Sequence, residues 1–86
     1  MSQGVEIANR LAPEHCEVMT RQPAKTVRRL VTAGAIFCGP YSPTVLGDYV
    51  AGPSHVMPTA GSARFSSPLN CWDFVRLTSL VALDAV

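Results

Sequence analysis

The chain has 86 residues, of which 48% are apolar and only 15% are charged, and its formal net charge is +1. This composition excludes an intrinsically disordered chain, which combines low hydrophobicity with high net charge, and favours one compact domain. The mean hydropathy of +0.21 indicates that many apolar groups remain at the surface of so small a domain. We therefore expect a homodimer or a higher symmetric assembly that covers this surface.

The first half of the chain predicts a βαβ unit. A short amphipathic helix over residues 4–11 comes first, and Pro13 ends it because the residue before a proline avoids helical geometry. Periodicity then predicts a strand over 16–20, a helix over 23–33 with Gly34 as its C-terminal cap, and a strand over 35–38. Two strands joined in this way run parallel with a right-handed crossover. The predicted fold class is α/β: a small, mostly parallel sheet with flanking short helices.

Shorter elements are predicted after residue 39. Ser42-Pro43 has the composition of an N-cap and first helical position, which predicts a short helix over 44–50, interrupted or ended near Gly47. Residues 51–67 carry turn signals without periodicity and predict a long ordered loop. The last expected elements are a short helix that starts at Ser67-Pro68 and carries Leu69 and Trp72, and a final strand over residues 77–83.

The sequence lacks the signals of several other classes. No apolar run approaches the roughly 20 residues that cross a bilayer, and the first residues lack the regions of a signal peptide, so we expect a cytoplasmic protein. Cys16, Cys38 and Cys71 are far apart without a C-x-x-C pair, which favours buried thiols over disulfides or a zinc knuckle. No glycine-rich loop for nucleotide phosphates is present. The basic cluster at residues 21–29 has no aromatic platform, so we expect a solvated helix face and no nucleic-acid partner.

Asp48 is a candidate for chemistry. It is the only formally charged residue between Leu30 and Ala63, and a buried carboxylate must be paired, hydrogen-bonded or metal-bound. A carboxylate that caps nearby amides or faces water explains the same spacing, so both interpretations stay open.

Both histidines are also candidates. Glu14 and His15 lie at a helix-to-strand junction, where side chains face a cleft in open α/β sheets, and either group suits a general acid or base. An exposed polar pair is the alternative. His55 lies in a glycine- and proline-containing turn and is either a loop surface residue or a ligand. The sequence disfavours Cys16 as a nucleophile activated by His15, because neighbouring strand residues point to opposite faces.

Four sequence blocks, taken together, resemble histidinol dehydrogenase. They are ANRLAPEH at residues 8–15, AGAIF at 33–37, LGDYVAGPSHVMPT at 46–59 and ARFSS at 63–67, and they match the family in order and spacing. The resemblance covers nearly the whole chain. It implies a homodimeric zinc enzyme of the cytoplasm that oxidises L-histidinol to L-histidine through the aldehyde with NAD. It also implies that residues 1–86 are one domain, equivalent to the second core domain of that family.

The resemblance assigns a role to each candidate residue. Glu14 would activate water in the second oxidation, and His15 would take the proton of the alcohol. Asp48 would be a zinc ligand close to the substrate, and His55 would line the substrate site. A hard carboxylate ligand beside the nitrogen donors of histidinol is chemically reasonable for zinc.

The resemblance also implies an incomplete site. The family's main NAD contacts, its other zinc ligands and its C-terminal tail have no counterpart in these 86 residues. One carboxylate does not make a zinc site of three or four ligands, so we expect neither zinc nor NAD to be bound tightly. The expected function is a fragment that is inactive alone but retains part of the site for L-histidinol or another imidazole ligand. The alternatives are a homo-oligomeric binding or structural module without this chemistry, and a subunit that completes an enzyme in trans.

Overall fold

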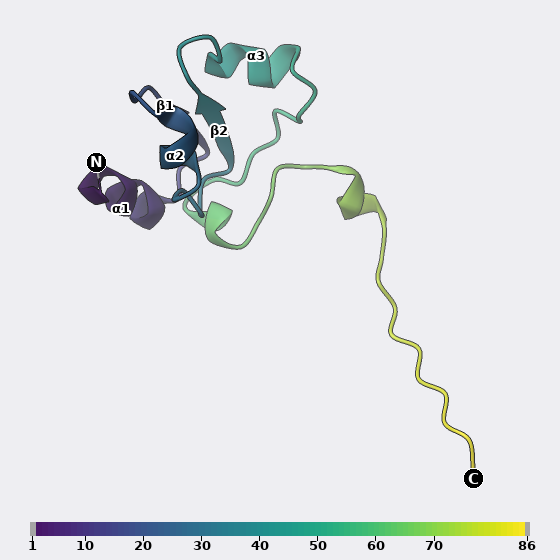
Figure 1. Cartoon of the computed structure of the whole chain (residues 1–86). Helices are drawn as coiled ribbons and strands as arrows, with labels where there is room; N and C mark the ends of the chain where they lie inside the picture. The colour runs from purple at the N-terminus through teal and green to yellow at the C-terminus, as the bar shows by residue number, and fades with distance from the viewer. Residues whose placement is uncertain (1, 86) are drawn as a thin grey trace.

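The computed structural model of the chain describes residues 2–85 (Figure 1). Its elements in chain order are helix α1 (Ser2–Leu11), strand β1 (His15–Val18), helix α2 (Pro23–Val27), strand β2 (Ala35–Cys38), helix α3 (Thr44–Tyr49) and the short 3-10 helices η1 (Ser62–Arg64) and η2 (Cys71–Phe74).

The centre of the fold is a two-stranded parallel sheet. β1 and β2 pair in a register that runs from His15 opposite Ala35 to Val18 opposite Cys38, and α2 lies between them in the chain. The predicted α/β class and the βαβ unit are therefore confirmed. In larger sheets, parallel strands are usually covered on both faces. This sheet has only two strands, so it buries little surface.

Helix α2 ends six residues earlier than the helix predicted over 23–33, and Gly34 does not cap it. The cause is Asn9 of α1, whose side-chain amide donates to the Arg29 carbonyl and accepts from the Val31 N–H, at 2.9 Å each. The Thr32 hydroxyl donates to the Asn9 carbonyl at 2.7 Å. The two bonds to the Asn9 side chain satisfy backbone groups that a longer α2 would have used internally.

Gly34 does not cap α2 but lies at the start of the sheet, where it contacts the residues before β1. Its N–H donates to the Pro13 carbonyl at 2.9 Å, directly before β2 begins. A Cβ atom at this position would lie 2.7 Å from the Glu14 carbonyl oxygen and 3.0 Å from Cγ of Pro58. Glycine therefore allows β2 and the loop around Pro58 to approach the start of β1.

Helix α3 begins at Thr44, as predicted, but its capping and its middle differ from the prediction. The N-cap residue is Pro43, which makes no side-chain cap, and the Ser42 hydroxyl instead donates to the Cys38 carbonyl at 3.0 Å. The helix continues through the buried Gly47 to Tyr49. Gly47 is tolerated because the ring of Phe37 occupies the space where a Cβ atom would lie.

The predicted final strand over residues 77–83 is wrong. Residues 75–85 form no helix or strand, and in Figure 1 they leave the body as an extended segment. A strand needs a neighbouring strand to take its backbone hydrogen bonds, and residues 2–85 offer none there. The radius of gyration is consequently 17.3 Å, against about 12 Å for a compact domain of this length.

The region before this segment follows its prediction in part. Residues 51–67 are mostly loop, as expected, and η1 is their only helical turn within the described residues. The short helix expected after Ser67-Pro68 is η2, which begins later, at Cys71. Asn70 caps η2: its side chain accepts from the Trp72 N–H while Asp73 accepts from the Asn70 N–H.

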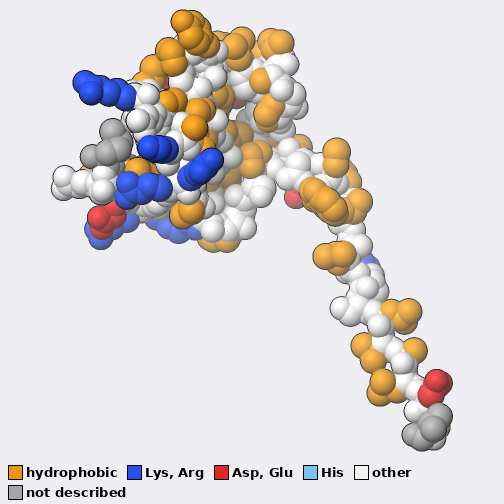
Figure 2. Space-filling model, in the orientation of Figure 1, with side chains coloured by type: hydrophobic (Ala, Val, Ile, Leu, Met, Phe, Trp, Pro, Cys, Tyr) orange, Lys and Arg blue, Asp and Glu red, His pale blue; other side chains and the backbone are white. Residues whose placement is uncertain are grey.

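The apolar core of the described residues is small and consists of Val5, Ala12, Val18 and Ala63. Large apolar side chains are exposed over α3 and along residues 65–83, as Figure 2 shows for the extended end of the chain. The three thiols were predicted to be buried. This is wrong for Cys38 and Cys71, which are exposed, and Cys16 is only half-buried. No helix within residues 2–85 is long and apolar enough to span a bilayer.

Candidate functional site

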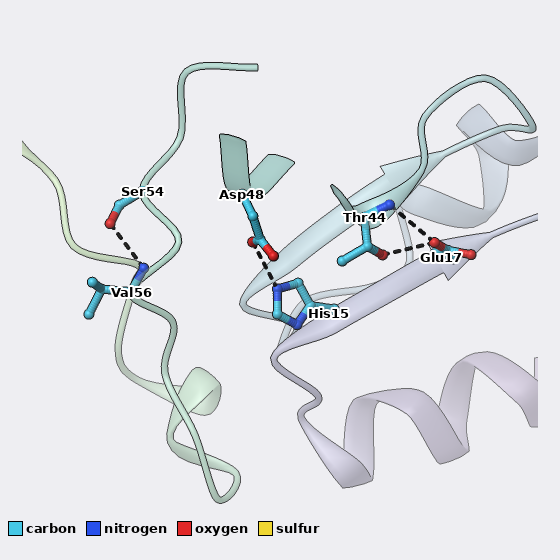
Figure 3. A network of polar contacts seen from close by, with 6 residues as sticks. All are labelled: His15, Glu17, Thr44, Asp48, Ser54 and Val56. Carbon is cyan, nitrogen blue, oxygen red and sulfur yellow. Dashed lines mark hydrogen bonds and ion pairs between the residues drawn. The ribbon is translucent and has the colours of Figure 1, made fainter. Parts of the chain in front are cut away.

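His15 and Asp48, which are 33 positions apart in the sequence, lie side by side in the structure. His15 opens strand β1 and Asp48 lies in the last turn of α3, with His15 Nε2 3.6 Å from Asp48 Oδ1 (Figure 3). Both side chains are about one-third exposed, at 31% and 33%. Two of the four candidate residues are thus brought into one site.

The imidazole of His15 has an apolar neighbour and an unsatisfied nitrogen. Its ring stacks on Phe37, with centroids 5.9 Å apart and an angle of 27° between the planes. Its Nε2 atom is buried and makes no hydrogen bond within the described residues. The 3.6 Å separation from Asp48 is an ion-pair distance but is too long for a hydrogen bond. The described residues thus leave this nitrogen without a hydrogen-bond partner.

A cavity of about 520 Å³ lies in front of the pair. This volume falls in the range typical of sites for small molecules. The cavity walls come from His15 at the start of β1, from strand β2, from helix α3 with the residues before it, and from the loop after it. Apolar lining residues include Phe37, Leu46 and Met57. The lining is mainly apolar with a few polar groups, which suits a small organic molecule with a polar end.

Glu14 and His55 lie outside this cavity. Both side chains are exposed, and neither is among the residues that line it. The Glu14 carbonyl nevertheless accepts from the Ala35 N–H at 2.8 Å and ties the site to β2. Beside His55, the Ser54 hydroxyl accepts from the Val56 N–H at 3.0 Å and orders the loop, as Figure 3 shows. The roles predicted for Glu14 and His55 remain predictions.

Two residues that shape the site were not predicted from the sequence. Phe37 supports the His15 ring, and Glu17 contacts Thr44 at the start of α3. Glu17 had a detectable signal, since it lies two positions after His15 in a strand and therefore on the same face. The contact of Phe37 with His15 had no local signal, because the two residues belong to different strands.

The described residues do not make a complete metal site. They contain no group of three or more His, Cys, Asp or Glu side chains that is placed to hold a metal ion. Catalytic zinc takes three protein ligands, so Asp48 and a neighbouring His15 are too few. The half-buried Cys16 does not help, because burial raises the pKa of its thiol and disfavours the thiolate that binds metals. Any zinc at this position needs donors from outside residues 2–85.

Comparison with known proteins adds a family to this geometry. The sequence profile described as Histidinol dehydrogenase matches residues 1–86. The chain is 55% identical over 82 residues to the histidinol dehydrogenase of Heliobacterium mobile, 57% to that of Nitratidesulfovibrio vulgaris and 51% to that of Bacillus subtilis. Each alignment covers 95% of this chain and 19% of the relative, so the chain spans about a fifth of their length. With His15 and Asp48 converging on one cavity inside the matching blocks, the chain belongs to the histidinol dehydrogenase family.

Proposed function

We propose that this chain provides the substrate-side part of an L-histidinol site, built around His15 and Asp48. The observation that supports the proposal is their convergence at 3.6 Å beside a cavity of about 520 Å³. The cavity has room for a molecule of histidinol's size, and its mixed lining suits an imidazole ring with a polar chain. Within this proposal, the residues correspond to the second core domain of the family.

His15 is the proposed proton acceptor for the alcohol. Oxidation of an alcohol removes one proton from the hydroxyl group and a hydride from the carbon, and histidine is the side chain suited to take a proton near neutral pH. The unsatisfied Nε2 of His15 is the atom proposed for this role. Asp48 Oδ1 lies 3.6 Å from this nitrogen.

Glu14 and His55 complete the proposed half-site. Glu14 activates the water molecule that the second oxidation requires, and His55 contacts the substrate. Both are exposed, so each is accessible to a ligand that extends beyond the cavity. Asp48 is the residue of this chain proposed to contact zinc when the other donors are supplied from elsewhere.

The chain alone is proposed to be catalytically inactive. The described residues supply too few donors for a zinc site, and the sequence lacks a glycine-rich loop for the phosphates of NAD. NAD reduction by the purified chain in the presence of L-histidinol and zinc would overturn this part of the proposal.

Calorimetric titration of L-histidinol, with and without zinc, tests whether the half-site is retained. Binding is expected to require zinc, because the imidazole and amino nitrogens of histidinol supply donors that residues 2–85 lack, and to be lost in Asp48→Ala. The matched control is Asp84→Ala, which removes an exposed carboxylate in the extended segment and should bind like the unmodified chain. Binding that is unchanged by Asp48→Ala, or an absence of binding under all conditions, would contradict a retained site.

One observation favours a second candidate function, a homo-oligomeric structural module. The extended segment exposes large apolar side chains such as Leu77, at 97% exposure, and surfaces of this kind favour association. This candidate predicts self-association without affinity for imidazole ligands. A third candidate, completion of an enzyme in trans, predicts co-purification with a separate polypeptide that supplies the remaining four-fifths of the family's length.

A further inference from the structure

A second polar contact joins β1 to α3 beside the His15–Asp48 pair. One carboxylate oxygen of Glu17, Oε1, accepts hydrogen bonds from the Thr44 backbone N–H at 3.2 Å and from the Thr44 hydroxyl at 2.8 Å. Figure 3 shows the two contacts next to one another, each linking the strand to the helix. Glu17 follows His15 by two strand residues, and Thr44 precedes Asp48 by four helix residues, so each pair shares one face of its element.

The spacing of the two contacts matches. Two residues along a strand span about 6.6 Å, and four residues along a helix span about 6.0 Å. Both contacts therefore form together in one axial position of α3 relative to β1. A slide of α3 by one turn, about 5.4 Å, would separate Asp48 from His15 and Thr44 from Glu17 at the same time.

Helix α3 has no device of its own that defines where it begins. Its N-cap residue, Pro43, has no side-chain group that accepts a hydrogen bond, and the helix is only six residues long. Helices of this length are not stable by themselves, and their first N–H groups lack partners within the helix. Glu17 supplies an acceptor for one of these groups from a different element. The start of α3 is thus attached to β1 by a contact from outside the helix.

An apolar contact restrains the distance of α3 from the sheet. Gly47 lies against the ring of Phe37 so closely that a Cβ atom would be 2.5 Å from Phe37 Cε1. This contact is non-directional, whereas the two hydrogen bonds from Thr44 to Glu17 are directional. Glu17 therefore adds a restraint on the axial position of α3.

We infer that Glu17 is the positioning residue that holds Asp48 in its place opposite His15. Glu17 does not touch the cavity, and its effect reaches the site through Thr44 and the helix that Thr44 begins. The inference rests on the proposed function in one respect only, namely that Asp48 and His15 are the site which this positioning serves.

Nuclear Overhauser measurements on the full chain test the positioning without any ligand. The readouts are cross-peaks between the His15 ring protons and the Asp48 Cβ protons, with backbone cross-peaks between β1 and β2 as the measure of folding. Glu17→Ala is expected to lose the His15–Asp48 cross-peaks and keep those of the sheet. Glu17→Gln is expected to retain both, because an amide oxygen accepts the same two hydrogen bonds.

Two further variants control the measurement. Glu6→Ala removes an exposed carboxylate whose partner is Arg10 in α1 and should leave all cross-peaks unchanged. If Glu17→Ala also loses the sheet cross-peaks, the test uses Thr44→Val and Thr44→Ser instead. Valine keeps the shape of threonine without its hydroxyl group, and serine keeps the hydroxyl group. Thr44→Val is then expected to weaken the His15–Asp48 cross-peaks, and Thr44→Ser to keep them. Unchanged cross-peaks in a folded Glu17→Ala, or in Thr44→Val, overturn the inference.

Calorimetry with L-histidinol and zinc separates failure of the inference from failure of the proposed function. If the unmodified chain binds, Glu17→Ala should weaken the affinity about tenfold and Glu17→Gln should restore it, since a hydrogen bond to a charged group is being replaced. If the unmodified chain does not bind, the proposed function fails while the cross-peaks still decide the role of Glu17.

Discussion

The ring of Phe37 fills the space where Gly47 would carry a side chain. A Cβ atom on Gly47 would lie 2.5 Å from Cε1 and 2.8 Å from Cζ of that ring. Phe37 also stacks on His15, so a single aromatic side chain contacts the proposed base on one side and the helix that carries Asp48 on the other. The distance between strand and helix at the site therefore depends on the absence of one methyl group.

Gly47→Ala is expected to force α3 away from the sheet. The added methyl group overlaps the Phe37 ring, and overpacking of this kind costs about 1–3 kcal/mol of the free energy of unfolding. Urea titration followed by circular dichroism measures this loss. Gly4→Ala is the matched control, because nothing lies within 4 Å of its new Cβ atom, and in helix α1 it should stabilise the chain by up to about 1 kcal/mol. Equal stability of the two variants would contradict the close packing of Phe37.

Asn9→Ala is expected to release the segment between α2 and β2. The side chain of Asn9 makes hydrogen bonds to Arg29 and Val31, and their loss should cost about 1–3 kcal/mol. Amide hydrogen exchange measures the effect locally, with faster exchange at Val31 and unchanged exchange within β1. Thr32→Val, which removes one hydrogen bond to the Asn9 carbonyl, should have a smaller effect of about 1 kcal/mol. Unchanged protection of Val31 in Asn9→Ala would show that the segment is held by other contacts.

The three thiols are expected to differ in reactivity. Burial raises the pKa of the Cys16 thiol, so less of the reactive thiolate is present at a given pH, whereas Cys38 and Cys71 are exposed. At pH 8 iodoacetamide should therefore modify Cys38 and Cys71 first, and the delay at Cys16 should shrink as the pH rises towards its pKa. Mass spectrometry of peptides over time measures the three rates, with the denatured chain as the control in which they converge. If iodoacetamide modified Cys16 as fast as it modifies Cys38, burial would not protect the Cys16 thiol.

Self-association is expected to depend on the apolar residues of the extended segment. Leu77 and Leu80 are almost fully exposed, and burial of each in an interface contributes about 1.5–3 kcal/mol. Analytical ultracentrifugation at micromolar concentration should find a species larger than the 9.2 kDa monomer. The double variant Leu77→Ser/Leu80→Ser should dissociate at a concentration at least about tenfold higher. The polar pair Thr78→Ala/Ser79→Ala should not, and a monomeric unmodified chain would contradict the proposed assembly.

Much of the candidate site was predictable because the relevant signals are local. Asp48 is the only charged residue in a long uncharged stretch, and His15 follows a predicted helix-to-strand junction. Their convergence followed from neither signal. It depends on a six-residue helix whose beginning is attached by Glu17 and whose middle rests on Phe37, both of which come from other elements.

Periodicity and contiguous motifs are properties of neighbouring residues, and they predict the βαβ unit and the family. Tertiary structure decided where α2 ends and whether residues 77–83 form a strand. Asn9 ends α2 early by taking backbone groups of the following turn, and the strand pattern at residues 77–83 forms no strand because no neighbouring strand within residues 2–85 is there to pair with it. A hydrogen-bond partner that is distant in the chain leaves no mark on local periodicity, which is the physical reason for both errors.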